Sequence, residues 1–445
     1  MKEMRMPAYI TRALSIIEES GKRGWPVGGC VRDTLMCREP FDYDITTNAL
    51  PDETKQIFEG FTVIETGLKH GTLTVHIDGH NVEITTLRRD GEYNDSRHPE
   101  TVSFTDSLTE DLARRDFTMN AVAYSTSEGF IDPFGGIGDI ENGVIRCVGD
   151  PHKRFGEDAL RILRALRFSS TLGFEIEEST ACAMLDLRQN LTLISHERVR
   201  EELVKLLCGR DVLRVLCDYA DIICTIIPEL MPCRGFDQRS PHHIYDVYEH
   251  CIRAVAATPP IAEVRMAALI HDIAKPECFT TDEDGIGHCR GHAKKSAELA
   301  RSILSRLRFD NRTKSRIVKL IELHDSYPKA NRAAVRRDIA RCGADLWESL
   351  ESLRRGDSAA KAPGAYGDEE IYFTAVRKLA EAIIAEGDCL CREMLAINGG
   401  DLSSLTGDGR QIGKTIDFLL GEVIDGRLPN DRDILIDAAK VMLTK

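Results

Sequence analysis

The sequence predicts an α+β chain in which a sheet-containing amino-terminal region is followed by helices. Residues 72–87 alternate apolar and polar side chains on both sides of the turn signal Asp78-Gly79, which is the pattern of a β-hairpin. After residue 150 the apolar residues recur with helical periodicity, as they do in 159–168 and 197–207. A length of 445 residues is enough for about two to four domains, each with its own core.

The composition is typical of a globular protein of the cytoplasm. Apolar residues make up 42% of the chain, and no run reaches the roughly 18 consecutive apolar residues of a membrane span. The amino terminus predicts an amphipathic helix rather than a secretion signal. The 14 cysteines show no CxxC spacing, which favours thiols in a reducing compartment. The net charge of −14 argues against indiscriminate binding to nucleic acid, but it is compatible with a local basic surface.

Two glycines, Gly28 and Gly29, precede a predicted helix start. A turn of this kind lets backbone N–H groups approach a phosphate, and Arg32 adds a charged donor beside Asp33. The ordinary alternative is a turn without a ligand, which is what most Gly-Gly pairs form. The phosphate-binding interpretation therefore depends on the residues that follow.

A pair of carboxylates, Asp42 and Asp44, follows in an extended segment. Residues i and i+2 of a strand share a face, so these side chains project together while Tyr43 and Ile45 face the core. Glu83 lies on the polar face of a later predicted strand and is the candidate third acid. Close carboxylates repel unless cations neutralise them, and a pair of Mg2+ ions held there suits in-line phosphoryl transfer. The alternative is that both aspartates are plain turn residues.

Four motifs follow one another along the first 161 residues: GGCVRD at 28–33, DYDITTNA at 42–49, RRDFTMNA at 114–121 and EDALR at 157–161. In this order they resemble the motifs of polymerase-β-like nucleotidyltransferases, in the bacterial class that contains CCA-adding enzymes and poly(A) polymerases. The resemblance implies a mixed-sheet nucleotidyltransferase head, a helical neck that selects the nucleobase and binds RNA, an HD domain and a helical tail. The boundaries that we expect for these domains are 1–148, 149–236, 237–340 and 341–445.

The same resemblance implies roles for individual residues. Asp42, Asp44 and Glu83 would be catalytic, with Mg2+ held by the two aspartates. The residues expected to bind the nucleotide are Gly28, Gly29, Arg32, Asp33, Arg115, Asp116, Asn120, Asp158, Arg161, Arg164 and Arg167.

Asp158 and Arg161 are candidates for choosing the nucleobase. The segment 155–168 predicts one amphipathic helix, on which residues i and i+3 share a face and Arg164 and Arg167 continue the row. A carboxylate accepts from the exocyclic amine of cytosine or adenine, and a guanidinium donates to the adjacent ring nitrogen. Uracil and guanine would leave both groups unpaired, at a cost of roughly 1–3 kcal/mol each. The alternative is a solvated face of salt-bridged residues.

The resemblance leaves the product open. The polar stretch 88–99 is typical of a loop, and the family carries such a loop in enzymes that switch from C to A addition, whereas enzymes that add only CC have a shorter one. This favours full CCA addition from CTP and ATP. The alternatives are an enzyme that adds only A and a poly(A) polymerase, although the latter usually ends in a long basic extension that this chain lacks.

A second site is predicted in the helical half of the chain. Histidines and aspartates appear in the order typical of the HD superfamily, and such side chains can ligate one or two divalent transition metals and activate water. The predicted ligands are His250, His271, Asp272, His292, His324 and Asp325. Some HD domains of this enzyme class hydrolyse 2′,3′-cyclic phosphates, whereas others only pack. A metal-dependent phosphohydrolase as the main activity, and a non-enzymatic RNA-binding protein, are the alternatives from other classes.

Transfer RNA is the macromolecular partner that the resemblance implies. Basic residues concentrate in three clusters, which could follow a phosphate backbone or form solvated helix faces. The clusters are Lys294 and Lys295; Arg301, Arg306, Arg308, Arg312, Lys314, Arg316 and Lys319; and Arg332, Arg336 and Arg337. The segment 390–431 resembles the carboxy-terminal body of Gram-positive CCA-adding enzymes, which holds the tRNA elbow. No membrane partner is expected, and the sequence leaves the oligomeric state open.

Overall fold

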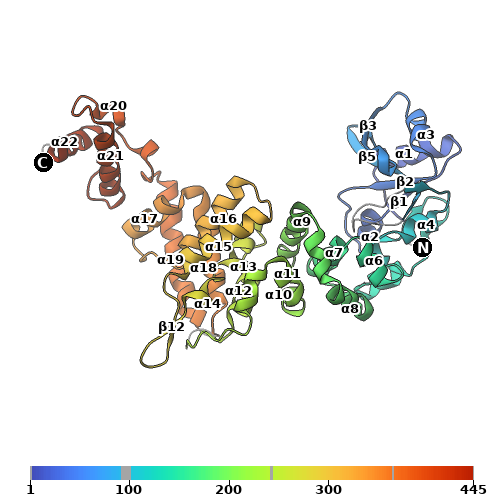
Figure 1. The fold of residues 1–445 in the computed structure, drawn as a ribbon. Helices are drawn as coiled ribbons and strands as arrows, with labels where there is room; N and C mark the ends of the chain where they lie inside the picture. Colours follow the sequence, from blue (N-terminus) through green and yellow to red (C-terminus); the bar gives the residue numbers. More distant parts are fainter. Residues whose placement is uncertain (1–2, 92–101, 241–243, 363–364, 444–445) are drawn as a thin grey trace. The chain divides into compact units, whose positions relative to one another are not determined.

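A computed structural model describes residues 3–91, 102–240, 244–362 and 365–443 (Figure 1). The chain forms two compact units. Unit 1 contains Met1–Asp211 and Tyr219–Ile226, and unit 2 contains Val212–Asp218 and Ile227–Lys445. Each unit is described separately below.

Unit 1 contains a seven-stranded mixed sheet with the strand order β3-β4-β5-β2-β1-β8-β9. Its strands are β1 (Gly24–Val27), β2 (Asp44–Thr47), β3 (Thr62–Gly67), β4 (Thr72–Ile77), β5 (His80–Thr86), β8 (Ala123–Ser125) and β9 (Gly129–Ile131). Strands β2 and β5 are parallel, and the other neighbours are antiparallel. The predicted hairpin is confirmed as β4–β5, and its turn has positive φ at both Asp78 (49°) and Gly79 (84°).

Two small sheets complete the β-structure of unit 1. They pair β6 (Arg88–Asp90) with β7 (Val102–Phe104), antiparallel, and β10 (Val144–Ile145) with β11 (Glu175–Ile176), parallel. The stretch 88–99, predicted as a loop, therefore begins with a strand, because ladder pairing with β7 outweighs its polar composition. Residues 92–99 lie outside the described part of the chain.

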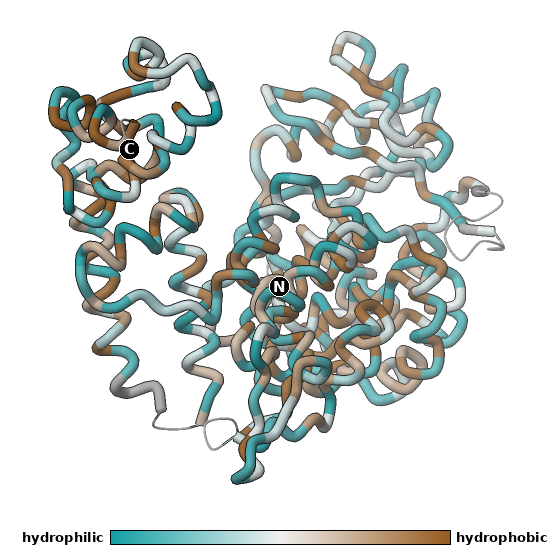
Figure 2. The backbone as a smooth tube through the Cα atoms, turned by 60° about the vertical axis from the view of Figure 1, so that its left-hand side comes forward, coloured by the Kyte–Doolittle hydropathy of each residue, from teal (hydrophilic) through white to brown (hydrophobic). Residues whose placement is uncertain are grey.

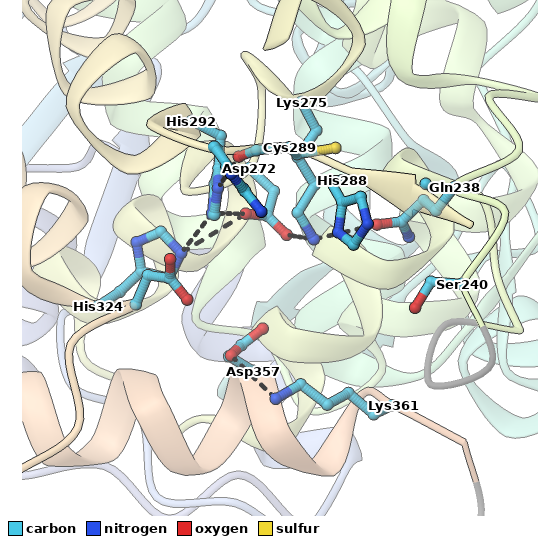
Figure 3. Close-up of a pocket in the computed structure, with 13 residues that line it drawn as sticks. Gln238, Ser240, Asp272, Lys275, His288, Cys289, His292, His324, Asp357 and Lys361 are labelled. Atoms are coloured by element: carbon cyan, nitrogen blue, oxygen red, sulfur yellow. Dashed lines mark hydrogen bonds and ion pairs between the residues drawn. The ribbon is translucent and has the colours of Figure 1, made fainter. Parts of the chain in front are cut away.

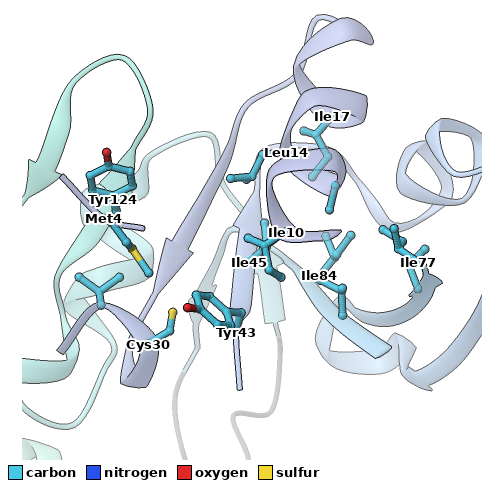
Figure 4. Close-up of a cluster of buried hydrophobic side chains, with 14 of the residues drawn as sticks. Met4, Ile10, Leu14, Ile17, Cys30, Tyr43, Ile45, Ile77, Ile84 and Tyr124 are labelled. Carbon is cyan, nitrogen blue, oxygen red and sulfur yellow. The ribbon is translucent and has the colours of Figure 1, made fainter. Parts of the chain in front are cut away.

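The helices of unit 1 cover the sheet and then continue as a helical segment. They are α1 (Ala8–Glu19), α2 (Gly29–Leu35), α3 (Pro51–Ile57), α4 (Leu108–Ala113), α5 (Gly136–Asn142), α6 (Pro151–Glu157), α7 (Leu160–Leu172), α8 (Glu178–Asp186), α9 (His196–Leu207) and α11 (Ala220–Ile226). The amphipathic α1 buries Ile10, Leu14 and Ile17 in a cluster with Ile45 of β2 and Ile84 of β5 (Figure 4). This packing holds the strands that carry the candidate carboxylates.

The prediction of one helix over 155–168 is wrong. Helix α6 ends at Glu157, Asp158 is extended (φ −145°, ψ 102°), and α7 begins at Leu160. The Asp158 carboxylate accepts a hydrogen bond from the Leu160 N–H at 3.0 Å. A short acceptor side chain that bonds the backbone two residues ahead favours a helix start over a helix interior. The break places Asp158 before the helix that carries Arg161.

Unit 2 is helical, as predicted, apart from one short hairpin. Its elements are α10 (Val212–Asp218), α12 (Val247–Ala257), α13 (Ala262–Ile270), α14 (Lys275–Cys278), β12 (Thr280–Thr281), β13 (Gly287–His288), α15 (His292–Arg306), α16 (Asn311–Leu323), α17 (Arg332–Cys342), α18 (Ala344–Ala359), α19 (Ala365–Ala385), α20 (Gly399–Leu402), α21 (Gly409–Ile424) and α22 (Arg432–Leu443). Helix α13 packs against α12, α16 and α18. The resulting bundle surrounds the predicted histidines.

The last helices of unit 2 have an apolar cluster of their own. Leu402, Leu419 and Leu435 are fully buried in it, and Figure 2 shows the corresponding apolar segments recurring along these helices. Among the described residues, no helix is both long enough and apolar enough to cross a membrane.

Candidate active site

The candidate carboxylates of unit 1 lie on two adjacent parallel strands. In the β2–β5 ladder Asp44 is the register partner of Glu83, and Asp42 precedes β2 by two residues. Tyr43 and Ile45 are buried at 9% and 1% exposure, so the predicted alternation of faces is confirmed. Parallel pairing of β2 and β5 therefore brings Glu83 close to Asp42 and Asp44, although Glu83 lies 41 positions after Asp42 in the sequence.

The electrostatics of these carboxylates fit divalent cations. Desolvation by the surrounding protein raises the pKa of Asp44, Arg115 acts in the opposite direction, and Asp42 raises the pKa further. Desolvation, Asp44 and Asp42 all raise the pKa of Glu83. The three acids line a cavity of about 760 Å³ together with polar side chains of β3, β4 and β5. Mutual repulsion at an accessible site with hard oxygen donors is what a Mg2+ ion relieves.

A buried network links the RRDFTMNA motif to the start of α2. Asn120 accepts a hydrogen bond from Arg32 at 2.9 Å and donates one to Asp116 at 3.0 Å. Asp116 also accepts from Arg164 of α7 at 2.8 Å, and Arg32 is further held by Asp33. Although burial opposes it, the charge of Arg164 and the hydrogen bonds lower the pKa of Asp116 to about 2.

Three guanidinium groups surround the ring of Phe168 on α7. The ring centroid lies 5.0 Å from Arg32, 5.5 Å from Arg164 and 3.9 Å from Arg167. Arg167 also donates to Glu202 of α9 at 2.6 Å. Phe168 and Glu202 were not predicted. They hold the positive charges in place, so the predicted arginines form a preorganised cationic surface.

Gly28 allows Arg115 to approach the backbone closely. Its φ is 75°, and a Cβ atom at this position would lie 2.9 Å from Nη1 of Arg115. Arg115 also lies 3.6 Å from Asp111, a fully buried carboxylate that was not predicted. A side chain at residue 28 would both strain the backbone and displace the arginine.

The structure does not pair Asp158 with Arg161. Asp158 instead accepts from Arg198 of α9 at 2.8 Å. Arg161 donates to Glu157 at 2.9 Å and to the carbonyl oxygen of Arg114 at 3.1 Å. The break between α6 and α7 thus gives each side chain a different protein partner. Arg198 was not predicted, because its role depends on α9 folding back onto α7.

The predicted histidines of unit 2 gather around Asp272, and His292 and His324 line a cavity together with it (Figure 3). His250 comes from α12, His271 and Asp272 follow α13, His292 begins α15 and His324 follows α16. All five are at most 7% exposed. Among the described residues, they form groups whose ligand atoms lie within 4.8 Å of one another, as a metal site requires.

One predicted ligand of this site, Asp325, is replaced by Asp357 in the structure. Asp325 lines the cavity but does not belong to the clustered ligand atoms, which instead include Asp357 of α18. A signal for Asp357 was present in the sequence, since it follows Leu346, Leu350 and Leu353 on the buried stripe of α18. A carboxylate at such a position requires a partner inside the protein.

The charges of this buried site depend strongly on one another. Burial disfavours the charged form of His271, yet the neighbouring Asp272 raises its pKa well above the ordinary value. Burial also opposes the ionisation of Asp272, but His271 and Lys275 lower its pKa well below the usual range. The lowered pKa of Asp272 favours an ionised carboxylate in a buried location, which is a donor that a divalent metal ion would use.

At least six of the twelve basic residues predicted to follow a phosphate backbone have acidic partners within unit 2. Arg306 pairs with Glu229, Arg316 with Glu263, and Lys295 with Glu277. Arg332 and Arg336 both pair with Asp388, and Arg337 pairs with Asp425. These helix faces are consequently less positive than their sequence suggests.

Comparison with known proteins matches three regions of the chain to protein families and aligns almost the whole chain with known enzymes. Residues 25–146 match the poly A polymerase head domain, residues 173–230 match the probable RNA and SrmB-binding site of polymerase A, and residues 243–352 match the HD domain. The CCA-adding enzyme of Lactiplantibacillus plantarum is 32% identical over 447 aligned positions, which cover 98% of each chain. The chain belongs to the family of CCA-adding enzymes.

Other CCA-adding enzymes agree with this assignment. That of Lactobacillus helveticus is 46% identical over 212 residues, and this alignment spans 47% of the present chain and about half (53%) of the relative. The crystal structure of the Bacillus stearothermophilus CCA-adding enzyme in complex with CTP has a TM-score of 0.73 and 29% identity, with 98% of both chains covered. As the sequence predicted, the protein is a nucleotidyltransferase with a polymerase-type head and an HD domain.

Proposed function

We propose that this protein adds C, C and A to the 3′ end of tRNA from CTP and ATP, without a nucleic-acid template and with release of pyrophosphate. The observation that carries the proposal is the register of β2 and β5, which sets Glu83 beside Asp44 and Asp42 in a family member aligned over its whole length. The cytoplasm, where tRNA is matured, is the proposed location.

The chemistry assigned to the head is a two-metal nucleotidyl transfer. Asp42, Asp44 and Glu83 would hold the Mg2+ ions. When bound, Mg2+ activates the attacking 3′-hydroxyl and neutralises the triphosphate and the departing pyrophosphate. The 3′-oxygen forms a bond to the α-phosphorus while the bond from that phosphorus to the pyrophosphate oxygen breaks, and the hydroxyl proton passes to solvent. Arg115, which lies close enough to lower the pKa of Asp44, would contact the nucleotide phosphates.

The cationic surface around Phe168 would orient the incoming nucleotide. Arg164 and Arg167 are fixed by Asp116 and Glu202, and Arg32 by Asp33 and Asn120, so little side-chain entropy remains to be lost on binding. The backbone N–H group of Gly29 would add a neutral donor to the triphosphate, whereas that of Gly28 donates to the carbonyl oxygen of Val122 at 3.4 Å. Asp33, Asp116 and Asn120 support the arginines in this scheme.

Asp158 and Arg161 would read the Watson–Crick edge of the base. In the structure Arg198 and Glu157 satisfy these two side chains, so a base would compete with partners that are already present. Cytosine and adenine offer both groups complementary atoms, whereas uracil and guanine do not. This competition disfavours a mismatched base, because such a base would break the contacts to Arg198 and Glu157 without forming hydrogen bonds in their place.

The decisive experiment uses purified protein, Mg2+ and a tRNA that lacks its last three nucleotides. CTP with ATP should extend it by C, C and A, and CTP alone by two residues. Extension confined to a tRNA that already ends in CC would identify an enzyme that adds only A, and a long A tail would identify a poly(A) polymerase. No extension under any condition would refute the proposal.

Base selection has its own test. Asp158→Ala should raise the use of UTP relative to CTP by roughly tenfold or more, since a lost discriminating hydrogen bond is worth about 1–3 kcal/mol. Asp186→Ala, which removes an exposed carboxylate of α8, is the matched control and should leave the ratio unchanged. Equal loss of activity with every nucleotide would point to a purely structural role for Asp158.

A second activity is favoured by the cavity of unit 2. We propose that the HD domain hydrolyses phosphoesters with a divalent transition metal, because Lys275 and Lys361 line the same cavity as His292, His324 and Asp272. A phosphoester anion would gain both cations. Release of phosphate or ring opening should be measured on p-nitrophenyl phosphate and 2′,3′-cyclic AMP with Mn2+, Ni2+ or Mg2+. Absence of turnover with all three metals would leave the HD domain without this activity.

A further inference from the structure

The cavity that holds the acids of unit 1 extends beyond them to a group of aromatic side chains. It is lined by Tyr9 of α1, by Phe41, and by His80 at the start of β5. Phe41 is 94% exposed, and the rings of Tyr9 and His80 are stacked, with centroids 4.1 Å apart and an interplanar angle of 9°. One exposed phenylalanine is ordinary on a protein surface, but three rings at the wall of one cavity offer a stacking surface. We call these three residues the aromatic rim.

The register of the sheet connects the aromatic rim to the acids. Asp44 of β2 is the register partner of Glu83 in the parallel strand β5. Counting back three residues from each of them leads to Phe41 and His80, both of which line the cavity. A strand rises about 3.3 Å per residue, so three residues span roughly 10 Å. This is about the extent of one nucleoside, so a base stacked on the aromatic rim would direct its ribose toward the acids.

Two exposed polar side chains lie between the aromatic rim and the acids. Asn81 follows His80 along β5, and its register partner is His76 of β4, whose Nδ1 lies 3.0 Å from Oδ1 of Asn81. An amide oxygen only accepts, so Nδ1 donates, Nε2 of the neutral ring remains an acceptor, and Nδ2 of Asn81 remains a donor. The 2′-hydroxyl of a ribose both donates and accepts, so the pair matches it.

The phosphate-binding groups of the proposed function lie on the other side of Asp44. The second register partner of Asp44 is Val27 of β1, which is followed directly by Gly28. Gly28 in turn lies against Arg115, since a Cβ atom at residue 28 would be 2.9 Å from Nη1 of that side chain. In the strand order β4-β5-β2-β1, the phosphate-binding groups are therefore on the β1 side of β2, and the His76–Asn81 pair is on the β5 side.

The cavity itself lacks the charges that a triphosphate requires. None of the described residues that line it is a lysine or an arginine, and three of them are acids. A nucleoside joined to its chain through one phosphodiester presents mainly its base and its ribose to such a wall. The cavity volume of about 760 Å³ lies within the roughly 300–1,000 Å³ of small-ligand pockets. The wall therefore suits the end of an RNA chain better than an incoming nucleotide.

In-line displacement decides which nucleotide occupies this side of the acids. The attacking oxygen approaches the phosphorus from the side opposite to the departing pyrophosphate. With the triphosphate on the β1 side of Asp44, the 3′-hydroxyl must come from the β5 side. On this basis, which rests on the proposed function, we infer that the aromatic rim and the His76–Asn81 pair bind the 3′-terminal nucleotide of the acceptor tRNA. The base stacks on the aromatic rim, and His76 and Asn81 form hydrogen bonds with the ribose.

Stacking suits an acceptor whose last base changes during the reaction. Before the first addition the terminal base is the one that each tRNA carries there, and afterwards it is C. Every base offers a π-face, so an aromatic surface holds each of them without reading its hydrogen-bonding edge. Selection by base edge is then confined to the incoming nucleotide.

The test measures stacking of the acceptor separately from addition. Full-length protein is titrated, without nucleoside triphosphate, into tRNA that lacks its last three nucleotides and carries 2-aminopurine as its 3′-terminal base. Stacking on the wild-type protein should quench the 2-aminopurine fluorescence. Phe41→Ala should lose most of the quenching and lower kcat/KM for the tRNA about tenfold, while the KM for CTP stays unchanged. Phe41→Trp should retain both properties, and Phe41→Leu should not.

A matched control and a second variant accompany this series. Leu50→Ala removes an apolar side chain that is 46% exposed beyond the opposite end of β2, and it should keep the quenching and the kinetics of the wild type. The wild-type protein should prefer a tRNA that ends in ribose over one that ends in 2′-deoxyribose. His76→Ala should reduce this preference, because the acceptor for the 2′-hydroxyl is lost.

The outcomes separate the inference from the proposed function. Because Phe41 is 94% exposed, its substitution should leave the core of unit 1 intact, which circular dichroism checks. Quenching and kcat/KM equal to wild type in Phe41→Ala would overturn the inference, and so would a matching rise in the KM for CTP. Wild-type protein that extends no tRNA would refute the proposed function, yet the fluorescence comparison would still decide whether the aromatic rim binds the acceptor.

Discussion

The candidate sites of units 1 and 2 both collect carboxylates, but they neutralise them differently. In unit 1 Asp42, Asp44 and Glu83 are accessible, and desolvation together with repulsion by neighbouring carboxylates raises the pKa of Asp44 and of Glu83. In unit 2 Asp272 and Asp357 are buried among four histidines, and their pKa values are lowered. The negative charge of the first site is therefore only partly offset, by Arg115, whereas the carboxylates of the second site have several cationic partners inside the protein.

This difference indicates how each site uses metal. Hard oxygen donors in an accessible cavity bind Mg2+ weakly unless the substrate phosphates contribute ligands, so the ions of unit 1 would arrive and leave with the nucleotide. Imidazole donors in a buried location suit a resident ion. The metal use that we propose is therefore exchange during turnover in unit 1 and retention of a resident ion in unit 2.

The largest effect is expected at the exposed site. Asp44→Ala should lower nucleotide addition to tRNA at least a thousandfold, about 4 kcal/mol of barrier, because the ions and the triphosphate lose a shared ligand. Initial rates with saturating CTP and Mg2+ measure this. Asp52→Ala removes a carboxylate of α3 that is 90% exposed and should keep wild-type rates. A residual rate above one hundredth would contradict the role assigned to Asp44.

The next largest effect is expected on the stability of unit 1, where the buried Asp116 pairs with Arg164. Asp116→Asn should lower the free energy of unfolding of unit 1 by about 3 kcal/mol, since Arg164 would keep its charge with only the more distant Glu202 (3.8 Å) as a buried partner. Urea denaturation at pH 7 measures the loss. The pKa of Asp116 is about 2 against an ordinary 3.8, so the carboxylate stabilises the fold above pH 3.8 and this contribution is lost as the pH falls toward 2. If wild type and Asp116→Asn still differed equally in free energy of unfolding at pH 2, the charge of Asp116 would not be the cause of the loss.

A resident metal should stabilise unit 2 and not unit 1. With free Mn2+ at a hundred times its dissociation constant, the free energy of unfolding should rise by about 2.7 kcal/mol per site. Calorimetric scans with Mn2+ and with EDTA measure the shift, and His292→Asn should reduce it. An equal shift in a variant that lacks all four histidines would place the metal elsewhere.

The smallest expected effect is on the thermal stability of a Glu83 variant, which should rise while its activity falls. Glu83 has a raised pKa, so its ionised form destabilises the folded state above that pKa, and the destabilisation is relieved as the pH falls through it. Glu83→Gln should therefore raise the midpoint of thermal unfolding slightly at pH 7 in EDTA, while nucleotide addition falls. Saturating Mg2+ with CTP should reduce the difference in unfolding midpoint between the variant and the wild-type protein, because it stabilises the wild type. A midpoint below that of wild type in EDTA would contradict the repulsion.

Much of the site was predictable where the signal is local. The alternation around Asp42 and Asp44 and the hairpin of Glu83 follow from strand periodicity and a two-residue turn. The HD histidines were predictable as a set, but Asp325 was chosen in place of Asp357. Asp325 was the predicted ligand because it directly follows His324 in the sequence. In the structure, the packing of α18 places Asp357, and not Asp325, among the clustered ligand atoms. The helix predicted over 155–168 failed because Asp158 bonds the Leu160 N–H.

By itself, the sequence determined the α+β order of the chain and its nucleotidyltransferase family, and it predicted most of the charged side chains that the structure brings together at the two candidate sites. Those features depend on spacing within strands and helices, which local geometry dictates. Only the tertiary structure decided which charged residues distant in the sequence pair with one another: Asp158 with Arg198, and Asp357 with His250. The physical reason is that a buried or crowded charge must find a partner, and packing decides which partner is within reach.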